Sequence, residues 1–212
     1  RLREVYNRAG VLNQWEKLAA ALHEVLDNPG LIEVEAAFLL GEVYLDHLDT
    51  PDEAAPWYER VRDEDPTHAQ ALERLRTIYQ SRGDATSEVE TLRALLNASS
   101  EVDAQRDLLR QIADVEGGRE QTEAAEEAWR EILRLGDTRD DDLARTALER
   151  MRDLLRRQER LDALVDLLRD QHASLPGADA RREVLYEIAG VQREAGRVDD
   201  AVATYREALD ED

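Results

Sequence analysis

Apolar residues recur along the chain in pairs of segments, each with the spacing of one helical face. Close to the C-terminal end, one apolar stripe covers residues 184–191 and a second covers residues 198–209, with a short polar segment around Gly196 between them. Apolar residues at intervals of three and four predict amphipathic α-helices. Glycine favours the left-handed backbone that ends a helix, so the two helices fold back on each other. The pattern therefore predicts an antiparallel helical hairpin.

Similar hairpin patterns follow one another along the chain at a nearly constant interval. Small residues recur where the two helices of a hairpin would cross closely, and large residues recur where one hairpin would meet the next. The small ones are Gly41, Ala54, Ala113, Ala125, Ala189 and Ala201, and the large ones are Tyr58, Leu92, Trp129, Leu168 and Tyr205. Self-similarity at a fixed interval of this size is the mark of a repeat architecture.

The repeated pattern resembles the tetratricopeptide repeat. In residues 36–66, a small residue lies three positions before Tyr44, Ala54 lies four before Tyr58, and Pro66 follows the second helix. The resemblance implies an all-α fold, namely an α-solenoid of antiparallel helix pairs with a right-handed superhelical twist. It implies one continuous array of five units, at about residues 34–68, 69–105, 106–144, 145–181 and 182–212, after a partial repeat at residues 1–33.

The middle of the chain departs from this pattern. Gly117 and Gly118, which we interpret as a turn, precede Arg119 at a point where the first helix of the third unit should still be finishing. In the fourth unit, Arg152 and Leu164 occupy positions that prefer small residues. The register of the fourth unit is therefore the least well determined by the pattern.

The charge of the chain restricts its partners. The chain has 28 basic and 49 acidic residues, a formal net charge of −21. Such a chain repels nucleic-acid phosphates and anionic lipid surfaces, so we expect neither nucleic acid nor a membrane as a partner. No stretch approaches the roughly 18 consecutive apolar residues of a membrane-spanning helix. The absence of Cys excludes a disulfide framework and a thiolate metal site.

No arrangement of residues indicates catalysis. His23, His47, His68 and His172 are scattered and have no partner at the spacing of a zinc-binding helix. The acidic run 140–142 is better explained as a helix N-terminus, where the helix dipole favours negative charge. We therefore expect a protein that is not an enzyme, with no catalytic residue, no metal and no cofactor.

The family resemblance implies binding in a concave groove lined by the first helix of each unit. The second, fifth, ninth and twelfth positions of the units supply eight acidic and three basic residues, with a few apolar ones. Such a groove would suit a basic, or mixed basic and apolar, peptide. An acidity spread over the whole surface explains the same charges equally well. The groove candidates are Glu35, Phe38, Glu42, Leu45, Gln70, Glu73, Thr77, Gln80, Asp107, Arg110, Asp114, Thr146, Glu149, Asp153, Arg156, Glu183, Tyr186 and Arg193.

The expected function is that of a non-enzymatic scaffold which binds a partner protein or peptide. Two alternatives stay open: a regulatory or targeting segment of a larger enzyme or signalling protein, and a repeat that assembles with itself into a homo-oligomer. The chain starts at Arg1 without Met and within a helical pattern, so we expect the native N-terminus to be missing. A cytoplasmic location is the default expectation, and a periplasmic one stays open for the same reason.

Overall fold

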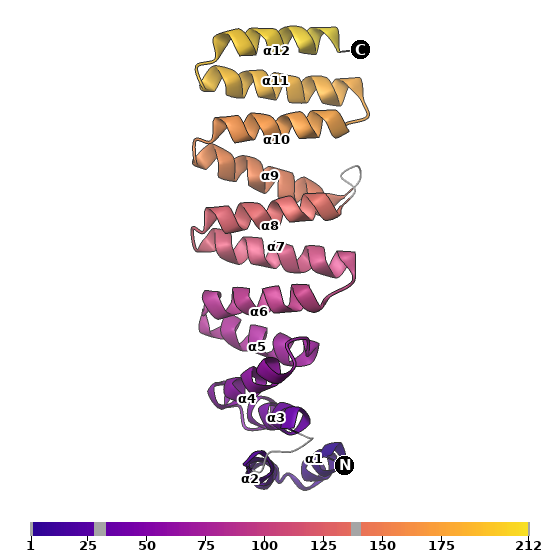
Figure 1. The fold of residues 1–212 in the computed structure, drawn as a ribbon, viewed down its shortest axis with the longest axis vertical. Coiled ribbons are helices and arrows are strands. Elements are labelled where there is room, and N and C mark those ends of the chain that lie inside the picture. Colours follow the sequence, from indigo (N-terminus) through magenta and orange to yellow (C-terminus); the bar gives the residue numbers. More distant parts are fainter. Residues whose placement is uncertain (1, 28–32, 137–140, 212) are drawn as a thin grey trace. The chain divides into compact units, whose positions relative to one another are not determined.

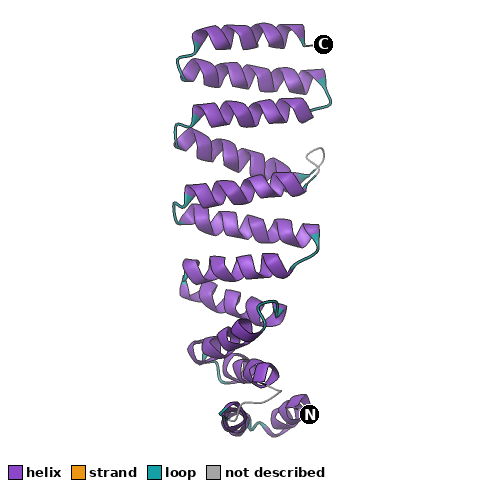
Figure 2. Ribbon diagram, in the orientation of Figure 1, coloured by secondary structure: helices purple, strands orange, loops and turns teal. Residues whose placement is uncertain are grey.

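The computed structural model describes residues 2–27, 33–136 and 141–211, and all of their regular structure is helical (Figure 2). Two compact units, residues 1–119 and 120–212, make up the chain. Within each unit, successive helices pack on one another (Figure 1). The expected α-solenoid class, with antiparallel helix pairs, is confirmed.

The first unit contains α1 (Leu2–Leu12), α2 (Trp15–Leu26), α3 (Glu33–Glu42), the π-helix η1 (Val43–His47), α4 (Pro51–Glu64), α5 (Ala69–Arg82), α6 (Ala85–Ala98) and α7 (Val102–Gly118). The second contains α8 (Thr122–Leu135), α9 (Asp142–Arg157), α10 (Leu161–Ser174), α11 (Ala178–Glu194) and α12 (Val198–Asp210). Helices α7, α9 and α11 begin three or four residues before the starts that the sequence pattern predicts for the third, fourth and fifth repeats. The expected boundaries at 106, 145 and 182 thus fall inside helices.

A residue with left-handed backbone stands two positions before each of α2, α4, α6, α8, α10 and α12. At Gly83 (φ 67°), the amide of the following Asp84 donates to the carbonyl of Tyr79 at 3.0 Å, a bond typical of a Schellman turn. Four of the six residues are not glycine, so this turn does not require glycine. These residues are Asn13, Asp49, Gly83, Glu120, Glu159 and Gly196.

The expectation of a turn at Gly117 and Gly118 is wrong. Both are the last residues of α7, and the left-handed residue is Glu120, with φ 60°. A Cβ atom on either glycine would meet no other atom within 4 Å. Neither a close approach nor an unusual backbone therefore requires glycine there.

Tyr58 fills the centre of the first unit. Its side chain is fully buried, and its ring meets Phe38 edge-on at 5.7 Å between centroids. The ring also lies directly against α3, because a Cβ atom on Gly41 would stand only 2.8 Å from ring carbons of Tyr58. The small residue at position 41 is therefore required by the close approach of α3 and α4.

Gly41→Ala should destabilise the protein by about 1–3 kcal/mol, because the added methyl group overlaps a buried ring. The loss should appear although alanine is the better helix former by about 1 kcal/mol. Urea unfolding of the full chain, followed by circular dichroism, measures the change. Gly117→Ala is the matched control and should be neutral or stabilising. Equal losses for the two variants would contradict the packing of Gly41 on Tyr58.

The π-helix η1 joins α3 to the N-terminal pair α1 and α2. Its last residue, His47, stacks on Trp15 with 3.5 Å between ring centroids. A hydrogen bond of 2.8 Å also joins His47 Nε2 and the hydroxyl of Tyr6. The π-helix has an i to i−5 hydrogen bond, from the Leu48 amide to the carbonyl of Val43. These ring contacts give Trp15 a packing role in the first unit.

The acidic run before α9 acts as a helix N-terminus, as expected. The carboxylate of Asp141 accepts hydrogen bonds from the amides of Leu143 (2.9 Å) and Ala144 (3.3 Å). These amides have no partner within the helix, so Asp141 satisfies them. Asp140 lies outside the described residues.

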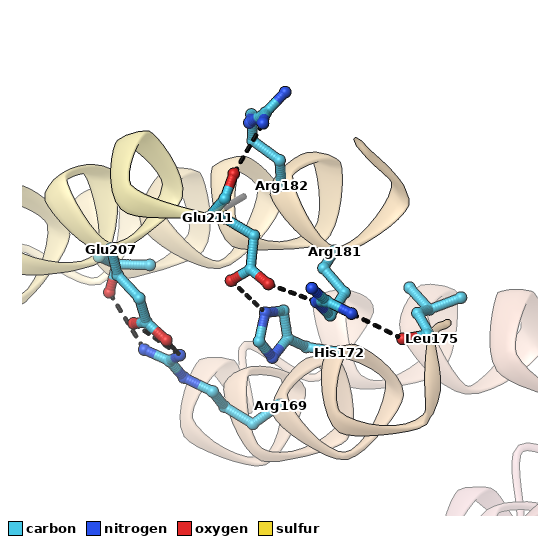
Figure 3. A network of polar contacts seen from close by, with 8 residues as sticks. Arg169, His172, Leu175, Arg181, Arg182, Glu207 and Glu211 are labelled. Carbon is cyan, nitrogen blue, oxygen red and sulfur yellow. Dashed lines mark hydrogen bonds and ion pairs between the residues drawn. The ribbon is translucent and has the colours of Figure 1, made fainter. Parts of the chain in front are cut away.

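The end of α12 is held to α10 and α11 by a polar network (Figure 3). The carboxylate of Glu211 accepts hydrogen bonds from Arg181 and, at 3.3 Å, contacts His172. Nearby, Arg169 donates to Glu207 at 2.7 Å. Hydrogen bonding from Arg181, then the interaction with His172, lower the pKa of Glu211 against the opposing effect of desolvation.

The network predicts a pH-dependent anchoring of α12. Because the pKa of Glu211 is lowered in the folded chain, its contribution to stability is complete above the ordinary value of 4.5 and disappears as pH falls through the lowered value. Amide hydrogen exchange in α12 should therefore be faster in Glu211→Gln than in the unmodified chain at neutral pH. The two rates should converge in acid. A difference that stays constant over this range would contradict the assignment.

Candidate protein-binding groove

Five of the predicted groove residues come together in a hollow between α3 and α5. The hollow has a volume of about 400 Å³ and is open to solvent. Residues three and four apart share one face of a helix, which explains why two turns of α5 contribute together. The lining residues are Phe38 and Glu42 from α3, and Ala69, Gln70, Glu73, Arg74 and Thr77 from α5.

Phe38 forms an apolar floor. Its side chain is only 6% exposed, because it is enclosed by Tyr58 and by His68, whose ring centroid lies 5.0 Å away. His68 is itself fixed, since its Nδ1 accepts a hydrogen bond from the Ala71 amide at the start of α5. Phe38 is therefore a rigid surface against which an apolar group could rest.

Ion pairs link the rim of the hollow to other parts of the first unit. Arg3 of α1 donates to Glu42 at 3.1 Å, and Arg74 donates to Asp46 of η1 at 2.7 Å. The Glu42 carboxylate is largely buried, whereas more than half of the Arg3 side chain is exposed. Solvent or a ligand can therefore reach Arg3, the ion-pair partner of Glu42.

A chain of polar contacts extends from this rim to α7. Arg76 contacts Glu73 at 2.8 Å and donates to Gln111 at 3.1 Å. Gln111 in turn donates to Asp107 at 2.8 Å. The first helices α5 and α7 therefore present one connected polar surface.

Asp107 and Asp114 of α7 are also paired with a basic residue of the protein. Arg110 contacts Asp107 at 2.8 Å and Asp114 at 3.2 Å. Hydrogen bonding from Arg110 lowers the pKa of Asp107, and that from Asp107 raises the pKa of Arg110. The surface expected to be strongly acidic is thus a mixture of paired charges along α5 and α7.

The remaining predicted groove residues lie on first helices of both units. Glu35, Leu45 and Gln80 belong to the first unit, Leu45 on η1, and the others belong to the second unit. Leu45 is half-buried against the core of the first unit, and Thr146 is half-buried on α9. The exposed residues are Glu35, Gln80, Glu149, Asp153, Arg156, Glu183, Tyr186 and Arg193.

Sequence reasoning missed Arg74, which lines the hollow. Arg74 lies four residues after Gln70 and three before Thr77, so helical spacing alone places the three on one face. Selecting fixed positions within each unit passed over it. Its ion pair with Asp46 joins residues 28 apart in the chain and has no local sequence signal.

Within residues 2–27, 33–136 and 141–211, no group of three or more His, Asp or Glu side chains is arranged to hold a metal ion. Nor does any helix in these ranges combine the length and the apolar character needed to cross a bilayer.

Comparison with known proteins identifies the type of repeat. A family model of the tetratricopeptide repeat matches residues 183–212, the last helix pair. No curated protein sequence matches the chain.

Similar folds occur among solved structures. A chain in the structure of Naa15/Naa10 bound to HypK-THB is 19% identical, with a TM-score of 0.59 over 95% of this chain and 30% of that one. A tetratricopeptide repeat protein from Parabacteroides merdae is 16% identical, with a TM-score of 0.50 over 99% of this chain and 78% of that one. At these identities the likeness concerns the fold.

Proposed function

Because this chain is a member of the tetratricopeptide repeat family, we propose that it is a protein-interaction scaffold which binds a peptide segment of a partner on its first helices. The observation that carries the proposal is the hollow between α3 and α5, with its apolar floor and charged rim. Binding sites commonly combine an apolar surface with a few polar groups that set orientation. A peptide with one apolar anchor and neighbouring polar groups fits this description.

The rim favours a basic group beside that anchor. Glu42 and Glu73 lie on the same hollow, and the side chain of Arg3, which is paired with Glu42, is 56% exposed. A Lys or Arg of the ligand can then take the place of Arg3 next to Glu42. Because the surface along α5 and α7 is already paired, we propose a segment of mixed apolar and basic character rather than a highly basic one.

A binding experiment tests this proposal. Fluorescent peptides that share one apolar anchor and carry zero, one or two basic residues are titrated with the full chain at low and moderate salt. Glu42→Gln with Glu73→Gln should raise the Kd of the basic peptides about threefold to tenfold and leave the neutral peptide unchanged.

The control removes two exposed carboxylates from second helices of the same unit, Glu64→Gln with Glu90→Gln, which should leave the Kd unchanged. If neutral and basic peptides bind equally weakly at both salt concentrations, the charge preference of the groove is refuted. Equal effects of the two double variants would attribute the preference to the overall charge.

A further inference from the structure

A second hollow lies among α8, α9 and α10, entirely within residues 120–212. Its volume is about 390 Å³, within the range of roughly 300–1,000 Å³ that ligand pockets occupy. Its floor is apolar, and it includes Met151, whose side chain is almost completely buried. The apolar lining residues are Leu133, Leu148, Met151, Ala163 and Leu167.

The hollow includes α9 and α10, which form the fourth repeat, whose sequence departs from the repeat pattern. Leu164 occupies the position that Ala201 occupies in the fifth repeat, and it is fully buried in a cluster with Leu155 and Leu185. A branched side chain at the crossing keeps α9 and α10 apart, and these two helices contact each other less than α11 and α12 do. The space left beside the crossing is the one that Leu148 and Met151 line.

This hollow is separate from the predicted groove. Glu149, Asp153 and Arg156 are spaced as one face of α9, and all three are exposed. Measured around the helix axis from Glu149, Leu148 lies about 100° away and Met151 about 160° away, because each residue advances about 100°. The remaining lining residues belong to the second helices α8 and α10.

The two walls of the hollow differ in charge balance. On α8, Arg130 contacts Glu126 at 2.7 Å, and Arg134 is paired with Glu131 of the same helix. On α10, Asp166 and Asp170 are one turn apart and exposed, and neither forms an ion pair with any described residue. Each arginine of the α8 wall thus has a carboxylate partner, although Glu126 is shared with Arg160, whereas Asp166 and Asp170 have no ion-pair partner among the described residues.

We propose that this hollow binds an amphipathic helix of a partner protein, with apolar side chains on the floor and Lys or Arg beside Asp166 and Asp170. The lining residues of α10 run from Ala163 to Ser174, about three helical turns, which matches a helix lying along it. Helices that bind grooves use apolar residues at three- and four-residue intervals. The site is additional to the first-helix groove and does not depend on it.

The single methionine of the chain provides a direct reporter. Because Met151 is the only Met, labelling with ¹³C-methyl methionine gives one methyl resonance, and it lies on the floor of the hollow. The probe is a helical peptide of about 15 residues, with leucines at i, i+3, i+4 and i+7 flanked by arginines. Its titration into the full chain should shift the Met151 resonance, with saturation.

Variants test the charge and the location. Asp166→Asn with Asp170→Asn should raise the Kd of the peptide about threefold to tenfold. Asp199→Asn with Asp200→Asn, which removes two exposed charges from α12, should leave it unchanged. Ala163→Phe should fill the hollow and abolish the shift, with circular dichroism to verify folding. Glu42→Gln with Glu73→Gln should leave the Kd measured from the Met151 resonance unchanged, which separates this site from the groove.

Three outcomes would overturn the proposal. The first is a Met151 resonance that does not move. The second is an equal effect of the two aspartate double variants. The third combines two results: a neutral detergent shifts the Met151 resonance as much as the peptide does, and replacing the arginines of the peptide by glutamine leaves its Kd unchanged. The hollow would then select apolar small molecules and not a basic helix.

Discussion

Tyr58→Ala should lower the free energy of unfolding by about 3–5 kcal/mol. The side chain is fully buried, so its removal leaves a cavity and takes a large apolar surface out of the core. The cavity cannot be refilled locally, because the facing residue on α3 is Gly41 and Phe38 is already held by His68. Urea unfolding of the full chain measures the loss, and hydrogen exchange should place it in α3 and α4.

Tyr58→Phe is the matched control. The Tyr58 hydroxyl is buried, and no described residue forms a hydrogen bond with it. Removing an unsatisfied hydroxyl should be neutral or stabilise the protein by about 1 kcal/mol, while the ring keeps its contacts. If the phenylalanine variant loses as much stability as the alanine variant, the ring is not the stabilising part of the side chain.

Leu164→Ala should cost about 2–5 kcal/mol, although it restores the small residue that the repeat pattern favours at this position. Leu164 is completely buried and packs with Leu155 and Leu168, so the helices have already adapted to the larger side chain. Shrinking it leaves a void between α10 and its neighbours. Urea unfolding, and hydrogen exchange in α9 and α10, measure the effect.

The control for this variant is Leu209→Ala. Leu209 is 73% exposed on α12, so the same change of side chain should alter stability by less than about 0.5 kcal/mol. A Leu164→Ala variant as stable as the unmodified chain would show that the repeat pattern, and not the packing seen here, determines what this position accepts.

The helix pairs could be predicted because apolar residues that are buried on one face of a helix recur every three or four positions along the chain. The two stripes around Ile188 and Tyr205, for example, correspond to α11 and α12. The starts of the helices were harder to predict, because the first turns of α7 and α11 contain exposed polar residues that carry no part of the apolar stripe, such as Asp103 and Asp179.

The turns show a different limit. Gly196 could be read from the sequence, but Glu120 and Glu159 adopt left-handed backbone although glutamate has no preference for it. A prediction that relies on glycine therefore misses these turns and misplaces the one near Gly117.

The sequence could predict which helix faces line the candidate groove, but not which side chains form ion pairs there. Helical spacing placed Gln70, Glu73 and Thr77 together, and the hollow includes them. The pairing of Glu42 with Arg3 joins residues 39 positions apart, so it depends on how α1 packs on the rest of the first unit. For the same reason, the sequence alone could not show that Glu42, Asp107 and Asp114 are paired with arginines.

The most direct test of the groove is hydrogen exchange on the full chain with the tightest mixed basic and apolar peptide from the titrations. We expect slower exchange in α3 and α5 with the peptide bound, and loss of that protection in Glu42→Gln with Glu73→Gln. Protection confined to α8 and α10, or none in α3 and α5 at saturating peptide, would contradict the assignment of the first helices as the binding surface.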